Sequence, residues 1–319
     1  MTANTKKRIA VLDDYQGVAL TSADWSRVTP RAEVVVFSDH IDGEDALVER
    51  LREFDVVCVM RERTPLTRSL IVRLPKLRLI ASTGPVNAAI DVTAARERDI
   101  EVAHTGYRST PTIEFAWSLI LASVRNIAQE SASLRNGGWQ VGVGGDLRGK
   151  VLGLVGLGNI GSEVAQIGTA FGMRIQAWSQ NLTAEKAEAS GAQLVTKDEL
   201  FSSSDIISVH LVLSQRTRGL IGAREFALMK QSARFINTSR GPIVVEQDLI
   251  DVLSRGAIAG AGIDVYEREP LPPDHPFRTL PNLLATPHIG YVTAGLYETF
   301  YGDTVESIVR WLDAQRGAR

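Results

Sequence analysis

The sequence predicts an α/β protein built from two doubly wound domains, each with a parallel sheet. Two observations carry this prediction: strand-like runs alternate with helical stretches along most of the chain, and a glycine-rich turn starts a second β-α series near its middle. Such alternation is typical of parallel sheets covered by helices on both faces. A length of 319 residues is enough for two domains of ordinary size, each with its own core.

The first β-α series ends near residue 105. Helical spacing is clearest from Glu44 to Glu53, between two strand-like runs. The expected strands are Ile9–Leu12, Ala32–Phe37, Val56–Met60 and Leu77–Ala81.

A long amphipathic stretch, residues 112–134, separates the two series and reads as one helix. It ends at a glycine-rich loop, residues 136–145. The second series begins at Val151, and the chain closes with a helical pattern from Leu296 to Trp311. Its further expected strands are residues 173–178, 206–209, 233–237, 260–265 and 283–285.

Composition excludes several classes of partner. The chain has 35 basic and 37 acidic side chains, for a net charge of −2, which gives no reason to expect a nucleic acid or a membrane surface. No apolar run approaches the roughly 20 residues that span a bilayer. Cys58, in an apolar run, reads as a buried strand residue. The N-terminal segment lacks a signal-peptide core. We therefore expect a cytoplasmic protein, and no metal site.

The glycine turn carries the first functional signal. A buried-strand pattern, residues 150–155, runs into Gly156-Leu-Gly158-Asn-Ile-Gly161, and a helical segment begins at Ser162. In a dinucleotide site the first glycine permits the turn, the second admits the pyrophosphate and the third packs helix on strand. An empty βαβ turn is the alternative, but the flanking strand and helix favour a dinucleotide.

The next strand ends without the acidic residue that usually binds the adenosine ribose of NAD. Ser179, Gln180 and Asn181 stand there, and none of them is an acid or an arginine. Neutral side chains can still hydrogen-bond a ribose hydroxyl. The pattern therefore favours NAD and leaves NADP open.

Three later strand ends carry candidate catalytic groups. Arg240 lies in Asn-Thr-Ser-Arg-Gly, the acids Glu267 and Glu269 in Asp-Val-Tyr-Glu-Arg-Glu-Pro, and His288 in Pro-His-Ile-Gly. Because carboxyl ends of parallel strands meet at one edge of a sheet, we expect all three beside the glycine turn. His40, His104 and His275 have no such surroundings and are expected to be structural or exposed.

The ordered motifs identify a resemblance. Arg-Glu-Arg-Thr-Pro-Leu-Thr at 61–67, Val-His-Leu-Val-Leu-Ser at 209–214 and the three motifs above follow one another with the spacing of one family. Over almost its whole length the chain resembles D-isomer-specific 2-hydroxyacid dehydrogenases, which include phosphoglycerate dehydrogenases and glyoxylate or hydroxypyruvate reductases.

The resemblance implies a hydride transfer between NAD(P)(H) and a 2-keto acid or D-2-hydroxy acid. In such enzymes Arg240 would bind the substrate carboxylate, for which a planar guanidinium is suited. Glu269 would pair with His288 and favour its imidazolium form. His288 would then protonate the carbonyl oxygen during reduction and take the proton back during oxidation. Glu267 would be a solvated neighbour.

The resemblance also implies a set of cofactor contacts. Asp264 would lie by the nicotinamide amide. Thr112 would be another contact, although its segment, residues 109–114, departs from the family's alanine-rich pattern. The remaining expected contacts are Gly156, Gly158, Asn159, Ile160, Gly161, Ser179, Gln180, His210, Leu211, Val212, Thr217, Thr238, Ser239 and Gly290.

Substrate contacts are expected from the loop after the fourth strand, at Gly84, Pro85 and Val86. Pro85 has no N–H to donate, so a neighbour must replace it. Arg61 and Arg63 are candidates for binding a phosphorylated or dicarboxylic substrate. Their alternative reading is as solvated surface charges.

The family likeness implies that residues 1–106, completed by 290–319, form a flavodoxin-like substrate domain. Residues 107–289 would form an inserted Rossmann domain that binds NAD(P). A homodimer is expected through the helix after the first crossing. Two alternatives remain: a dinucleotide-sensing, corepressor-like binding protein and a phosphite-type dehydrogenase. A formate-type enzyme fits less well, because glutamine would replace Glu269.

Overall fold

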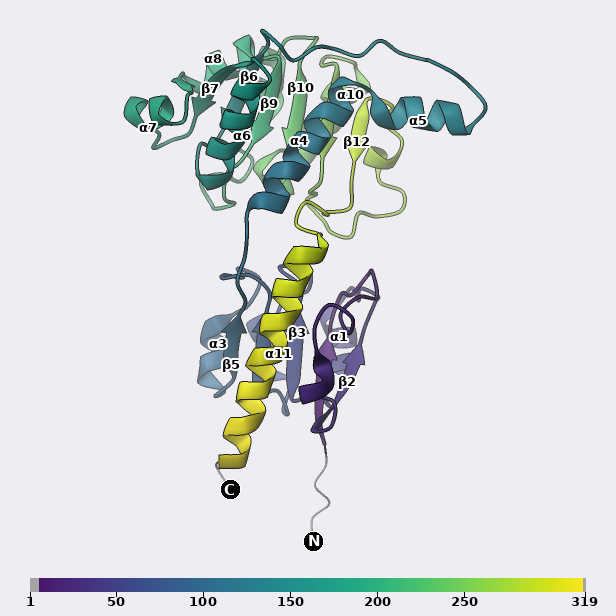
Figure 1. Cartoon of the computed structure of the whole chain (residues 1–319), viewed down its shortest axis with the longest axis vertical. Coiled ribbons are helices and arrows are strands. Elements are labelled where there is room, and N and C mark those ends of the chain that lie inside the picture. The colour runs from purple at the N-terminus through teal and green to yellow at the C-terminus, as the bar shows by residue number, and fades with distance from the viewer. Residues whose placement is uncertain (1–5, 318–319) are drawn as a thin grey trace. The chain divides into compact units, whose positions relative to one another are not determined.

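The computed structural model of the protein describes residues 6–317 (Figure 1). The chain forms two compact units: unit 1 is Met1–Arg108 with Val292–Arg319, and unit 2 is Ser109–Tyr291. Residues 1–5 and 318–319, at the ends of the predicted first domain, lie outside the described residues.

Unit 1 contains a parallel five-stranded sheet in the order β2-β1-β3-β4-β5. Ile9 on β1 pairs with Val34 on one side and Val56 on the other, so the strand order reverses next to β1. This is the flavodoxin-like order. The strands are β1 (Lys7–Val11), β2 (Ala32–Val36), β3 (Val56–Val59), β4 (Leu79–Ser82) and β5 (Glu101–His104).

Helices cover both faces of this sheet. Alternate strand residues such as Ala10, Val57 and Ile80 pack against the short helices on one face. The opposite face is covered by α11 (Ala294–Gly317), which contacts β4 and β5 and runs across the sheet in Figure 1. The other helices of unit 1 are α1 (Glu44–Leu51), α2 (Arg68–Val72), α3 (Val92–Glu97) and the 3₁₀ turn Trp25–Arg27.

Unit 2 contains a parallel seven-stranded sheet in the order β12-β11-β10-β9-β6-β7-β8. Its order reverses between β6 and β9, and ligands of open α/β sheets bind at the carboxyl edge of such a switch point. The strands are β6 (Val151–Val155), β7 (Arg174–Trp178), β8 (Gln193–Leu194), β9 (Ile206–Val209), β10 (Arg234–Asn237), β11 (Gly260–Ile263) and β12 (Leu283–Ala285).

The two faces of this sheet bury different sets of side chains. Leu152 and Leu154 on β6 pack with α4 (Thr110–Val124) and α6 (Asn159–Ala170), which lie in front of the sheet in Figure 1. Val155 joins the opposite layer, which is covered by α8 (Lys197–Ser203), α9 (Ala223–Leu228) and α10 (Glu246–Ser254). Unit 2 also contains α5 (Ile127–Arg135), α7 (Ala184–Ala189) and the 3₁₀ turns Gly241–Ile243 and Pro276–Arg278.

The predicted fold class of two doubly wound parallel sheets is confirmed, with two differences in detail. The single helix expected over residues 112–134 is wrong, because Asn126 adopts a left-handed φ of 51° and separates α4 from α5. The prediction also omitted β5 and the two-residue β8. Among residues 6–317, no helix combines the length and apolar character needed to cross a membrane.

Candidate active site

The histidine and glutamate predicted as an acid/base pair are in contact in unit 2. His288 Nδ1 lies 2.5 Å from Glu269 Oε2. A carboxylate in this position favours the proton on Nδ1 and leaves Nε2 outside the contact. The side chains are 21% and 29% exposed, respectively, so the pair is partly shielded from water and its attraction is strengthened.

Asp264 shapes the loop that carries His288. Its Oδ1 accepts hydrogen bonds from Thr286 Oγ1 at 2.7 Å and Ile289 N at 2.9 Å, and its Oδ2 accepts one from Gly290 N at 2.8 Å. Burial raises the pKa of Asp264, whereas these donors favour its charged form. His288 has a left-handed φ of 54°, a conformation that the surrounding bonds must maintain. Asp264 was expected to lie by the nicotinamide. In the structure its carboxylate also holds the loop that carries His288.

Arg240 follows β10 in a loop with its own hydrogen bonds. Asn237 Nδ2 donates to Arg240 O at 3.2 Å, and Asn237 Oδ1 accepts from Ser239 N at 3.0 Å. Ser239 Oγ donates to Val209 O at 2.7 Å, which ties the loop to β9. The Arg240 guanidinium donates to Ser239 O at 2.8 Å. The expected carboxylate-binding arginine therefore stands on a strand end next to β11 and β9.

Two residues without a role in the sequence predictions join these loops. Tyr266 N donates to Glu269 Oε1 at 3.0 Å. Gly241 lies so close to Tyr266 that a Cβ there would meet the Tyr266 carbonyl at 2.1 Å. Gly241 can be recognised in the sequence, because it directly follows Arg240. The Tyr266 N–H is a backbone donor, and nothing in the sequence marks it. Glu267, as expected, is solvated and pairs with Arg218 at 3.2 Å.

The glycine turn has the geometry of a dinucleotide site. Gly156 has a φ of 105°, and a Cβ there would meet His210 O at 2.6 Å, so only glycine fits. A Cβ at Gly161 would lie 2.2 Å from Gly156 O, so this glycine packs α6 directly on the turn. At Gly158, by contrast, a Cβ would meet no described atom within 4 Å. The backbone is therefore open at the position where a pyrophosphate must approach.

The start of α6 and the end of β10 also fit NAD. Gly158 is the N-cap of α6, so no capping side chain competes for the first N–H groups, which favour an anion. Thr238 Oγ1 is buried and has no hydrogen-bond partner within the described part of the chain. A bound ligand would satisfy this hydroxyl. Asn159, Ile160 and Gly161 would hold the pyrophosphate through their backbone.

His210 lies beside the glycine turn in an uncharged form. Burial lowers the pKa of His210 to about 4. Its Nε2 lies 2.9 Å from Ser208 Oγ, and its carbonyl packs on Gly156. The His210 backbone therefore packs on the glycine turn, and its ring is engaged by Ser208.

The other expected cofactor contacts occupy the same unit in varied settings. Ser179 and Gln180 follow β7 directly, where the ribose contact was expected. Thr217 is engaged within its own loop, where its hydroxyl donates to Val212 O at 2.8 Å and accepts from Ser214 N at 2.7 Å. Leu211 is partly buried against the core, and Thr112 lies in the first turn of α4.

In unit 1, the loop expected to bind substrate is already partly occupied. Gly84 N donates to Thr105 Oγ1 at 2.7 Å, and Pro85 has no N–H. Of the three expected residues, Val86 therefore has the backbone N–H that bonds no protein group in the described part of the chain. The Arg61 guanidinium lies against Gly84, where a Cβ would be 1.6 Å from Nη1. Arg61 also donates to Thr83 O at 3.2 Å.

The remaining candidate cations and histidines have structural partners. Arg63 donates to Asp13 O at 2.8 Å and stacks on Tyr15, so it is part of the fold of unit 1 rather than a solvated charge. His40 pairs with Asp13, whose hydrogen bond raises the pKa of His40. His275 pairs with Glu246 at 3.0 Å, and His104 is exposed. Within the residues described, no group of three or more His, Cys, Asp or Glu side chains is arranged to hold a metal ion.

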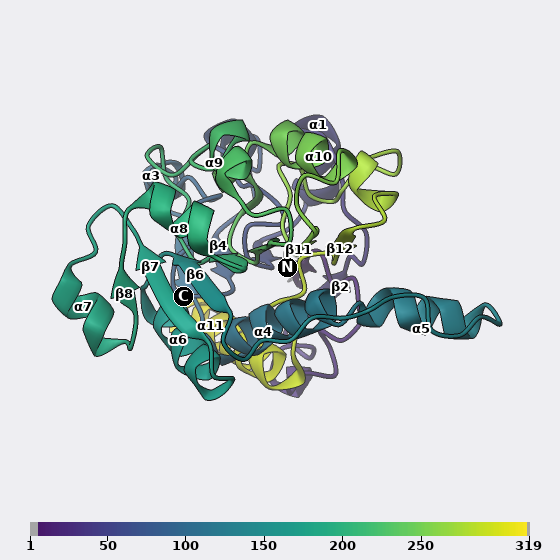
Figure 2. The same ribbon diagram turned by 90° about the horizontal axis from the view of Figure 1, so that it is seen from above.

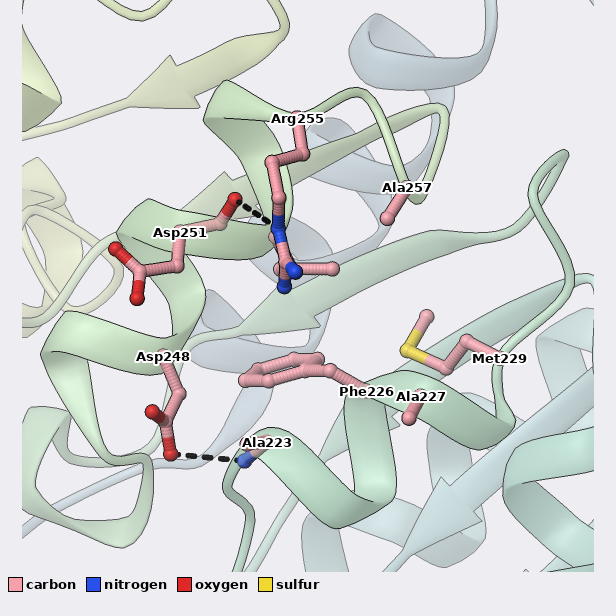
Figure 3. A pocket seen from close by; sticks show the side chains of 9 residues that line it. Ala223, Phe226, Ala227, Met229, Asp248, Asp251, Arg255 and Ala257 are labelled. Atoms are coloured by element: carbon pink, nitrogen blue, oxygen red, sulfur yellow. Dashed lines mark hydrogen bonds between the residues drawn. The ribbon is translucent and has the colours of Figure 1, made fainter.

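A cavity of about 280 Å³ lies between α9 and α10, away from these groups (Figure 3). Phe226 forms part of its wall. Its charged residues bond the neighbouring backbone: Asp248 accepts from Ala223 N at 2.8 Å, and Arg255 Nε donates to Asp251 O at 3.2 Å. None of the expected site residues lines this cavity.

Comparison with known proteins agrees with this geometry. The model of the "D-isomer specific 2-hydroxyacid dehydrogenase, NAD binding domain" matches residues 117–290. A glyoxylate reductase of Aeropyrum pernix is 38% identical over 78% of this chain and 77% of its own. A hydroxypyruvate reductase of Thermotoga maritima is 38% identical over 88% of this chain and 92% of its own. The crystal structure of a phosphoglycerate oxidoreductase from Vibrio cholerae superimposes with a TM-score of 0.91 at 37% identity, covering 97% and 99% of the two chains.

The glycine-turn geometry fits a dinucleotide, and the matched domain model identifies it as NAD. The share of the chain covered by the model, and the identity to the two reductases over most of their length, fix the family. The protein is an NAD-dependent oxidoreductase and belongs to the D-isomer-specific 2-hydroxyacid dehydrogenase family.

Proposed function

We propose that the protein interconverts a 2-oxo acid and the matching D-2-hydroxy acid, with His288 and Glu269 as the acid/base pair. The single observation that carries this proposal is the 2.5 Å contact between His288 Nδ1 and Glu269 Oε2. Carbonyl reduction needs a proton donor beside the hydride site, and this pair follows strands of the sheet that also holds the glycine turn.

In the proposed reduction, bound NADH supplies the hydride to the carbonyl carbon. His288 Nε2 gives its proton to the carbonyl oxygen, so that one hydride and one proton complete the hydroxyl-bearing product. Glu269 stabilises the imidazolium before the transfer and holds the ring in one orientation afterwards. In the reverse direction, Nε2 accepts the hydroxyl proton as the hydride leaves.

Arg240 is proposed to bind the substrate carboxylate. A guanidinium remains charged at any working pH and can donate two parallel hydrogen bonds to a carboxylate. The loop bonds of Ser239 and Asn237 support this role, because they restrict the backbone from which the side chain projects. Restricted donors lose less entropy when a substrate binds.

In unit 1, Arg61 and the Val86 N–H are proposed as further substrate contacts. Arg61 is held by Thr83 O and lies 5.4 Å from the ring of Tyr107, and its side chain is 16% exposed. A guanidinium held in this way suits an anionic group on the substrate beyond the shared carboxylate. A phosphorylated or dicarboxylic 2-oxo acid would supply such a group.

For Arg61→Gln, we expect KM to rise about tenfold or more for 2-oxoglutarate, which has a second carboxylate, and to change little for glyoxylate, which has none. The reason is that a charged hydrogen bond contributes about 1.5–3 kcal/mol. Steady-state kinetics on both substrates checks this. Arg68→Gln is the matched control, because Arg68 pairs with exposed Glu97. Equal effects on both substrates would remove Arg61 from specificity.

The proposed reaction is tested with a substrate panel and a separate binding measurement. Glyoxylate, hydroxypyruvate, phenylpyruvate and 2-oxoglutarate are reduced with NADH or NADPH, 3-phosphoglycerate is oxidised with NAD or NADP, and NADH binding is followed by fluorescence. We expect NADH binding and turnover of at least one 2-oxo acid. NADH binding without any turnover, combined with redox-dependent capture of a partner, would instead support a dinucleotide sensor. Phosphite oxidation alone would support a phosphite-type enzyme.

We further propose that the protein acts as a homodimer through α5 and the following glycine-rich loop. No α5 residue is buried among the residues described, and Figures 1 and 2 both show this segment extending from the rest of unit 2. Glu130 accepts from Val141 N and Gly142 N, so the loop is held along the helix. Trp139 is 74% exposed and Val143 96% exposed. A second copy of the chain would cover these side chains.

For the double variant Trp139→Ser/Val143→Ser, we expect a monomer where the unaltered protein sediments as a dimer, because burial of two large apolar side chains is lost at the interface. Analytical ultracentrifugation at micromolar concentration measures this. Leu20→Ser, at another exposed apolar position in unit 1, serves as the control. A monomeric unaltered protein would contradict the proposed dimer.

A further inference from the structure

Tyr266 lies where the three catalytic loops of unit 2 meet. It follows β11, and the residue is only 6% exposed. Its ring packs near Phe277, with 6.2 Å between ring centroids. Because the ring is buried, its hydroxyl must find a partner inside the protein or lose solvation without compensation.

The first contact of Tyr266 orients Glu269. The Tyr266 N–H donates to Glu269 Oε1 at 3.0 Å, while the other oxygen of that carboxylate contacts His288. With both oxygens engaged, the carboxylate cannot rotate without breaking one of the two bonds. The backbone of Tyr266 therefore sets the plane in which Glu269 meets the imidazole.

The second contact fixes the loop that carries His288. Tyr266 Oη donates to Thr286 O at 2.7 Å, and the same carbonyl accepts a hydrogen bond from His288 N at 3.0 Å. Thr286 Oγ1 is in turn bonded to Asp264. The tyrosine hydroxyl thus holds the turn in which His288 adopts its left-handed φ of 54°.

The third contact places the loop of Arg240. Gly241 packs so tightly on Tyr266 that a Cβ at Gly241 would lie 2.1 Å from both the carbonyl carbon and the carbonyl oxygen of Tyr266. The backbone next to Arg240 therefore rests on the backbone of Tyr266. A shift of Tyr266 would move this loop together with the other two.

We infer that Tyr266 is a positioning residue that sets the mutual arrangement of Arg240, Glu269 and His288. It acts through its hydroxyl on the His288 turn, through its N–H on Glu269 and through close packing on Gly241. This inference rests on the function proposed above. Catalysis is sensitive to such positioning because small displacements of an acid/base group sharply reduce the fraction of reactive geometries.

The test is Tyr266→Phe, which removes the hydroxyl but keeps the ring packing and the backbone N–H. We expect kcat for the best 2-oxo acid of the panel to fall about threefold to tenfold, the effect of one lost hydrogen bond, while the Kd for NADH stays unchanged. Tyr297→Phe is the matched control, because the Tyr297 hydroxyl is also buried and makes a hydrogen bond to Gln16 at 3.2 Å in unit 1. We expect its kcat to stay within twofold of the unaltered protein.

The split between kcat and KM separates positioning from general weakening of the fold. The Tyr266 hydroxyl bonds the backbone of the His288 turn and does not bond Arg240, so Tyr266→Phe should lower kcat and leave KM for the 2-oxo acid unchanged. A lower free energy of unfolding with an unchanged kcat would mean that the hydroxyl only stabilises the fold, and would overturn the inference.

A double-variant cycle with Glu269→Gln provides the second test. If Tyr266 acts through the Glu269–His288 pair, then adding Tyr266→Phe to Glu269→Gln should cost less than twofold, because the carboxylate contact that the turn aligns with His288 is already removed. Fully multiplicative effects would show that the tyrosine acts independently. That outcome would overturn the inference.

A measurement without cofactor tests the role of Tyr266 independently of the proposed function. The proton on His288 Nδ1, in its 2.5 Å contact with Glu269, should give a far-downfield proton resonance that disappears in His288→Ala. Tyr266→Phe should move that resonance upfield, and an unmoved resonance would contradict the inference. If instead His288→Ala retains full turnover, the proposed function fails whatever the resonance does.

Discussion

For His288→Ala, we expect kcat to fall about 100-fold to 10,000-fold in the reduction of any 2-oxo acid that the protein accepts, the range typical for loss of a general acid. The carbonyl oxygen would have to take its proton from water, and Glu269 would lose the group it orients. NADH affinity should stay unchanged, because the glycine turn is formed by β6 and α6, apart from the His288 loop. Single-turnover kinetics and NADH fluorescence titration measure the two quantities separately.

His104→Ala is the control for this prediction, since His104 is exposed on β5 of unit 1. Its kcat should match that of the unaltered protein. Normal turnover in His288→Ala would remove His288 from the chemistry. A loss of NADH binding together with kcat would instead indicate a disturbed fold, which circular dichroism would detect.

The parts of the fold that sequence reasoning predicted share strong local signals. Strands such as Val151–Val155 and Ile206–Val209 are buried on both faces, so their apolar runs are continuous and easy to identify. The omitted strand β5 has only partly buried or exposed residues, and β8 has two residues, so neither produces such a run. The break at Asn126 depended on one left-handed residue in an otherwise helical pattern.

The site shows the same division between local and long-range information. The His288–Glu269 contact was implied by motifs whose side chains carry the chemistry, and the structure places the two atoms 2.5 Å apart. The hydrogen bond from Gly84 N to Thr105 Oγ1, by contrast, joins two loops through a backbone donor. The Tyr266 hydroxyl reaches the carbonyl of Thr286 in the same way. Backbone partners have no residue identity, so a single sequence gives no sign of them.

The second large effect is expected at the glycine turn, where Gly158→Ala and Gly161→Ala should fail in different ways. At Gly158 the backbone φ is −86° and the Cβ position is open, so alanine is compatible with the fold. Its methyl group would occupy the space through which the pyrophosphate approaches. We expect the Kd for NADH to rise about 5-fold to 150-fold, the equivalent of about 1–3 kcal/mol of steric overlap, with an unchanged unfolding midpoint.

Gly161→Ala should instead destabilise unit 2 itself. Its methyl group would lie 2.2 Å from Gly156 O, a backbone atom that cannot move unless α6 shifts away from β6. We expect a loss of about 1–3 kcal/mol in the free energy of unfolding, together with loss of NADH binding. Gly302→Ala, inside α11 with no described atom within 4 Å of the added Cβ, is the control and should be neutral or stabilising by up to about 1 kcal/mol. Denaturant unfolding and NADH titration of the three variants distinguish these outcomes. Unaltered NADH binding by Gly158→Ala would mean that the pyrophosphate does not pass over this glycine.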